Sequence, residues 1–73
     1  MNSFAELDIV QLRNAHPEYS LRAGARGTVV LVHRQGEAYE VEFMQPDGFT
    51  QAVLTLPAAE LATSAAQVVG QAA

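Results

Sequence analysis

The stretch AYEVEF at residues 38–43 decides the fold of this 73-residue chain. Its apolar and polar residues alternate with the two-residue period of a strand that has one face buried and the other face in water. We therefore expect Tyr39, Val41 and Phe43 to point into a hydrophobic core, while the two glutamates between them face solvent.

Two further strands flank this stretch and are joined to it by short turns. The β-branched run TVVLV at residues 28–32 is too short for a typical helix, and residues 33–37 contain the glycine that a hairpin loop of three to five residues requires. A second turn, QPDG at residues 45–48, has proline for its first corner position and glycine for a positive φ. It leads to a third strand at residues 51–56, so these segments predict an antiparallel meander.

The N-terminal segment allows two interpretations. Ser3 and Glu6 would suit a capping box that starts a helix over residues 4–13. Residues 7–12 are rich in branched apolar side chains, however, and a meander of three strands would have little core by itself. We therefore favour a strand at residues 7–12.

The remaining segments complete a small barrel. Residues 14–26 form a long loop, because Pro17 disfavours a helix before it, and Pro57 opens one helical or 3-10 turn before a short strand at residues 61–63. This order of elements predicts an all-β fold, a small five-stranded SH3-like barrel with a long first loop and one 3-10 turn before the last strand. We assign residues 1–5 to a lead, 6–63 to the barrel and 64–73 to an uncharged C-terminal tail.

The same segments resemble a known family. The resemblance is carried by LDIV at residues 7–10, PEYSL at 17–21, GTVV at 27–30, GEAYEVEF at 36–43 and LTL at 54–56. It extends over residues 6–62 and is similar to a family of short bacterial proteins catalogued as a domain of unknown function (family 4926) and expected to adopt SH3-like barrels. The resemblance implies the barrel and no established chemistry, although some members of such families look like partners or antidotes in bacterial toxin systems.

Charge and composition narrow the possible partners. Eight acidic and four basic residues give a net charge of −4, and all four cations are arginine. So few cations disfavour nucleic acids and anionic membranes. The chain has no cysteine, no apolar run long enough to span a membrane and no secretory signal pattern, so we expect a cytoplasmic protein without disulfides.

No residue pattern points to an enzyme. The serines and threonines lack a nucleophile elbow, and Glu40 and Glu42, although spaced for paired-carboxylate chemistry, lie on an exposed strand face. His16 and His33 could hold a metal only together with carboxylates, and two surface histidines are far more common than such a site. We therefore predict a non-enzymatic chain without a metal or cofactor.

The segment GARGTV at residues 24–29 resembles the KOW motif of ribosomal and transcription proteins, in which glycine precedes a valine-rich strand. That likeness is general among SH3-like barrels, where glycine permits a sharp corner. RNA binding is therefore the least favoured of our hypotheses, because a basic patch is absent.

The best functional candidates lie in the long loop and on the acidic strand face. Loops on a rigid scaffold often bind partners, and Tyr19 and Leu21 either plug the end of the barrel or contact a partner. We hypothesise a protein-binding module, such as an inhibitor or antidote of a basic toxin or nuclease, and as an alternative a self-assembling barrel that uses its exposed edge and its tail. The partner-binding candidates are His16, Pro17, Tyr19, Leu21, Glu40, Glu42 and Phe49.

Overall fold

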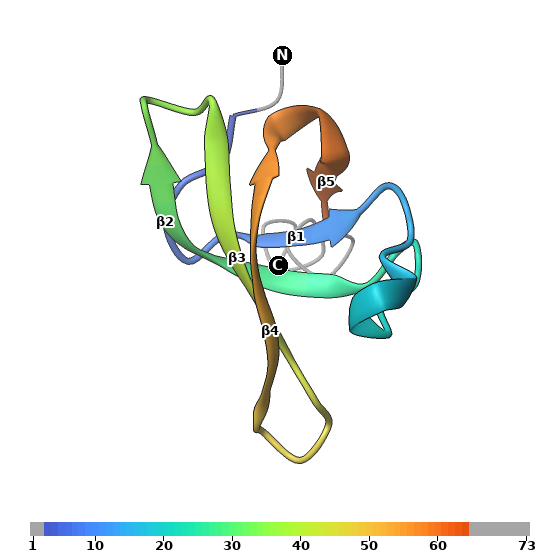
Figure 1. Cartoon of the computed structure of the whole chain (residues 1–73). Coiled ribbons are helices and arrows are strands. Elements are labelled where there is room, and N and C mark those ends of the chain that lie inside the picture. The colour runs from blue at the N-terminus through green and yellow to red at the C-terminus, as the bar shows by residue number, and fades with distance from the viewer. Residues whose placement is uncertain (1–2, 65–73) are drawn as a thin grey trace.

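The computed structural model describes residues 3–64, which form one antiparallel sheet of five strands in the order β4-β3-β2-β1-β5 (Figure 1). Two 3-10 turns interrupt the connections, η1 at Pro17–Tyr19 and η2 at Ala58–Glu60. No helix in this part of the chain has the length and apolar character needed to cross a membrane. The strands are β1 (Ile9–Leu12), β2 (Arg26–His33), β3 (Ala38–Met44), β4 (Thr50–Pro57) and β5 (Leu61–Thr63).

This architecture confirms the predicted fold class, including the long first loop and the 3-10 turn before the last strand. The helical alternative for residues 4–13 is wrong, because residues 9–12 pair with both β2 and β5. The turn η1 inside the long loop was not predicted. The more specific description as an SH3-like barrel stays a prediction.

The core is built around the inner face of β3. Tyr39 and Val41 are completely buried and Phe43 is 1% exposed, as the alternation predicted. The two glutamates between them lie on the outer face but are only partly exposed. The other buried apolar residues are Phe4, Val10, Leu12, Leu21, Val29, Leu54, Leu56 and Leu61.

A β-bulge in β2 changes which side chains of its apolar run face inward. Val29 pairs with Val41 and the next pair is Leu31 with Glu40, so Val30 has no partner in β3. Since the extra residue shifts the alternation, Leu31 lies on the outer face and is 43% exposed. The inward pattern resumes at Val32, opposite Tyr39.

Residues at both boundaries of the predicted barrel are buried. Phe4, in the predicted lead, packs edge-on against Tyr39 with ring centroids 5.4 Å apart, and its backbone N–H donates a hydrogen bond of 3.1 Å to the Tyr39 hydroxyl. Ser64, the first residue of the predicted tail, is fully buried, and its N–H donates to the carbonyl of Ile9. Residues 65–73 of the tail lie outside the described residues.

Gly27 does not form the sharp corner that the KOW comparison suggested. It lies inside β2, opposite Val10 of β1, and it is buried without a positive φ. A Cβ atom at this position would lie 2.6 Å from Cγ1 of Val41 and 2.8 Å from Cε1 of Phe43. The glycine is therefore required by the close approach of β2 to the core side chains of β3.

Replacing Gly27 by alanine should destabilise the fold, because buried Val41 and Phe43 leave no room for the added methyl group. We expect Gly27→Ala to lower the free energy of unfolding by about 1–3 kcal/mol, measured by urea denaturation. The matched control is Arg26→Ala, an exposed neighbour that should change the free energy by less than about 0.5 kcal/mol. Equal stability of the two variants would contradict this packing.

Candidate protein-binding site

The long loop between β1 and β2 folds back on itself. His16 and Leu21 form an isolated antiparallel bridge through two backbone hydrogen bonds of 2.8 and 3.1 Å. The turn η1 lies between them, with Pro17 in its first turn, where a missing N–H is tolerated. It ends at Ser20, which has a left-handed conformation with φ of 59°. Pro17 was a local signal that could have predicted this turn.

One side of the loop is held by hydrogen bonds to the segment formed by η2 and β5. The Nε2 atom of His16 lies 3.0 Å from Oε1 of Glu60. Arg13 donates from Nε to the carbonyl of Leu61 at 3.0 Å, and from its backbone N–H to the carbonyl of Glu60. These contacts place His16 in a supporting position, with its side chain only 19% exposed.

The other side of the loop is fastened to β4 by one glutamine. Gln51 donates from Nε2 to the carbonyls of Tyr19 at 2.9 Å and Ser20 at 3.1 Å. It occupies an irregular position in β4, because the register shifts between the pairs Phe43–Ala52 and Met44–Thr50. Nothing in the local sequence pattern indicated this contact, which joins the loop to the β3–β4 hairpin.

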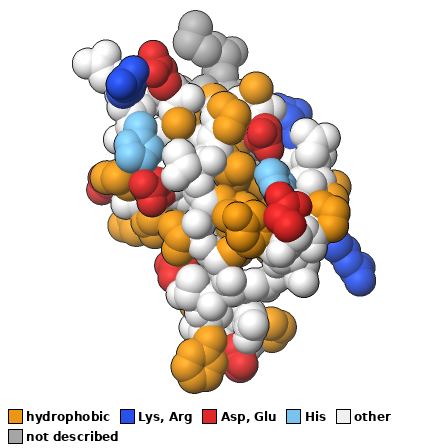
Figure 2. Space-filling view, in the orientation of Figure 1, with side chains coloured by type: hydrophobic (Ala, Val, Ile, Leu, Met, Phe, Trp, Pro, Cys, Tyr) orange, Lys and Arg blue, Asp and Glu red, His pale blue; other side chains and the backbone are white. Residues whose placement is uncertain are grey.

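The β3–β4 hairpin extends well beyond the other strands (Figure 1). In its turn, Gly48 has φ of 93° and donates to the carbonyl of Gln45, and the Asp47 side chain accepts the N–H of Phe49. Met44 and Phe49 at the base and tip are 54% and 73% exposed. Figure 2 shows apolar side chains beside an acidic one at the tip of this hairpin.

The structure separates the two candidate residues whose role the sequence left open. Leu21 is 6% exposed and belongs to the core, so it plugs the end of the sheet. Tyr19 is 45% exposed and remains available to a partner. Pro17 is also exposed, so the accessible candidates of the loop lie on η1.

The acidic strand face is less free than the sequence suggested. Glu40 is paired with His33, with Oε2 and Nε2 2.9 Å apart, and Glu42 accepts a hydrogen bond from the Thr50 hydroxyl. His16 and His33 thus contact different carboxylates. Among residues 3–64, no three histidine, aspartate or glutamate side chains gather closely enough to hold a metal ion.

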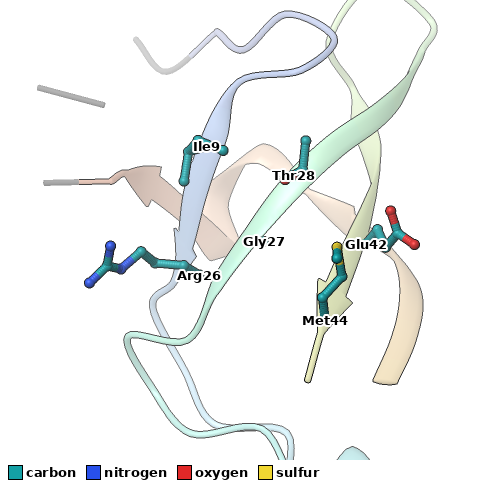
Figure 3. Close-up of a pocket in the computed structure, with 6 residues that line it drawn as sticks. All are labelled: Ile9, Arg26, Gly27, Thr28, Glu42 and Met44. Carbon is teal, nitrogen blue, oxygen red and sulfur yellow. The ribbon is translucent and has the colours of Figure 1, made fainter. Parts of the chain in front are cut away.

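Two shallow hollows meet near the start of β2. The smaller, about 140 Å³, lies on the outer face of β1, β2 and β3 (Figure 3) and is lined by Ile9, Arg26, Gly27, Thr28, Glu42 and Met44. The larger, about 400 Å³, lies between the loop and the β3–β4 hairpin and is lined by Ser20, Leu21, Arg22, Ala23, Gly24, Ala25, Arg26, Phe43, Met44 and Gln51. Both include Arg26 and Met44, so the loop side and the acidic face are connected there.

Residues 6–63 match the family described as Domain of unknown function (DUF4926). The chain belongs to this family. The matched range contains all five strands and the whole long loop. No match was found among curated proteins or among solved structures.

Removing the Gln51 contact should loosen the loop without unfolding the sheet. In Gln51→Ala the carbonyls of Tyr19 and Ser20 lose their hydrogen-bond donor. We therefore expect amide hydrogen exchange in residues 16–21 to become about fivefold faster, which corresponds to a loss of about 1 kcal/mol in the free energy of local opening. The control is Gln45→Ala in the exposed turn, which should leave exchange in the loop unchanged. Unaltered exchange in Gln51→Ala would show that this contact does not hold the loop.

Proposed function

We propose that this chain is a non-enzymatic protein-binding module, and that its contact surface is the end of the sheet where the long loop meets the β3–β4 hairpin. The observation that carries the proposal is the exposure of three large side chains there: Tyr19 at 45%, Met44 at 54% and Phe49 at 73%. Tyrosine and phenylalanine bury large areas at low entropic cost and are enriched at protein interfaces.

The supporting elements are fixed before any partner binds. The loop is fastened to β5 through Arg13 and to β4 through Gln51, and the hairpin turn is closed by hydrogen bonds of its own. A preorganised surface loses less conformational entropy on binding than a flexible one. This property suits a small domain whose function is recognition.

A finer form of the proposal is an inhibitor or antidote in a bacterial system, acting in the cytoplasm. It is supported by the small size and by the net charge of −4, which favours a neutral or basic partner as a whole. Glu40 and Glu42 contribute to that charge from the outer face of β3.

The test is quantitative capture of proteins from a lysate of the source organism. The double variant Tyr19→Ser, Phe49→Ser should capture about tenfold less partner than the wild-type chain, because central aromatic residues dominate interface energies. Leu7→Ser is the matched control, since Leu7 is 76% exposed but precedes β1 at the end away from the loop. A folded double variant that captures the partner as well as the control would contradict the proposal.

Self-assembly remains a second candidate because of β4. It is one of the two edge strands of the sheet, the other being β5, and its eight residues, TQAVLTLP, include no charged side chain. Natural edge strands are commonly protected by charges. Antiparallel pairing of two β4 strands would form a closed two-fold dimer without bringing like charges together.

A lysine in the middle of β4 tests this second candidate. Val53 is 50% exposed and faces Glu42 within its own sheet, so Val53→Lys should be tolerated by the monomer. In a β4–β4 dimer it would introduce two positive charges at the interface, and we expect light scattering to show conversion of a dimer to a monomer. Val30→Lys on β2 is the control that should leave the dimer intact. A wild-type chain that is monomeric at millimolar concentration would eliminate this candidate.

A further inference from the structure

The four arginines of this acidic chain divide into two kinds. Arg13 donates to the Leu61 carbonyl, and Arg34 forms an ion pair with Glu37. The guanidinium groups of Arg22 and Arg26 form no hydrogen bond or ion pair within residues 3–64, and both side chains are exposed. Figure 3 shows Arg26 directed away from the carboxylate of Glu42.

Both unpaired arginines line the larger hollow between the loop and the hairpin, about 400 Å³ in volume. None of the residues that line it is acidic, although the whole chain has twice as many acidic as basic residues. The hollow is therefore a local positive site on a negative protein. Such a reversal of local charge is a basis for selecting an anionic group.

The walls of the hollow add two features besides charge. The loop wall turns at Arg22–Ala25, where Gly24 has φ of 88° and the N–H of Ala25 donates to the carbonyl of Arg22. Within the described residues, the backbone N–H groups of Arg22 and Ala23 have no acceptor. On the opposite side, the Met44 side chain, which is 54% exposed, provides an apolar surface, and Phe43 lies buried beneath it.

We infer that this hollow binds an acidic segment of the partner protein, an extended peptide whose carboxylates pair with Arg22 and Arg26. Arginine forks bind carboxylates through two parallel hydrogen bonds, which gives strength and direction. An apolar side chain next to the carboxylates would lie against Met44. This inference rests on the proposed protein-binding function, and it specifies the chemistry that the partner presents.

A peptide accounts for the hollow better than a nucleic acid does. Nucleic-acid binding depends on several cations that neutralise successive phosphates, whereas this surface offers two, on a chain of net charge −4. The apolar surface of Met44 would also make no favourable contact with a phosphate backbone. The negative remainder of the surface would repel long polyanions, while a short acidic segment meets only the hollow.

The experiment uses the full chain as bait for a phage-displayed library of random dodecapeptides, followed by fluorescence polarisation with the enriched peptides. We expect enriched sequences to contain two Asp or Glu residues with an apolar residue between or beside them. Their affinity for the variants Arg22→Gln and Arg26→Gln should be about tenfold lower for each. Arg34→Gln is the matched control, because it removes one exposed cation outside the hollow and should leave affinity unchanged.

Any of four outcomes would overturn the inference, and the first three are no enriched peptide, enriched peptides without acidic residues, and binding that is indifferent to both variants. A fourth is tighter binding of a single-stranded oligouridine than of any enriched peptide at about 0.15 M salt, which would assign the arginines to phosphates. The proposed function is tested separately, since capture that depends on Tyr19 and Phe49 but not on Arg22 and Arg26 would preserve it and remove only the acidic segment.

Discussion

The structure depends on the inner face of β3, the strand that lies between β2 and β4. Tyr39, Val41 and Phe43 are buried there with almost no exposed surface, and they belong to one core cluster with side chains from every other strand of the sheet. The side chains of Val41 and Phe43 also lie so close to the backbone of β2 that only glycine fits at position 27. The position of the loop that follows β1 is in turn set by this core, because Leu21 belongs to it.

The proposed binding surface is held in place by hydrogen bonds between residues that lie far apart in the sequence. Gln51 reaches the loop across 31 and 32 residues of sequence, and His16 reaches Glu60 across 44. These contacts turn a stretch of 13 residues between two strands into a fixed wall beside the hairpin. Exposed aromatic side chains and unpaired arginines then lie on this support, where we propose that a partner binds.

The sequence was most informative where a local rule decides the conformation. Alternation predicted β3 and its buried side chains, and Pro46 together with Gly48 predicted the turn at residues 45–48. The bulge at Val30 had no local signal, because an extra residue in a strand is recognised only from its pairing with the neighbouring strand. The division of roles between Leu21 and Tyr19, and the lack of partners for Arg22 and Arg26, likewise depend on which distant residues approach them. A pattern of residue types cannot supply that information.

The pairing of Phe4 with Tyr39 has a consequence for where this domain can be cut or joined. The side chain of Tyr39 is fully buried, and its hydroxyl oxygen accepts a hydrogen bond from the backbone N–H of Phe4, whose ring covers the same tyrosine. A shortened form starting at Glu6, where the family match begins, would remove both the covering ring and the hydrogen-bond donor, and it would expose the apolar ring of Tyr39 to water. Chimeras and minimal versions of this domain should therefore retain Phe4 and be fused upstream of it.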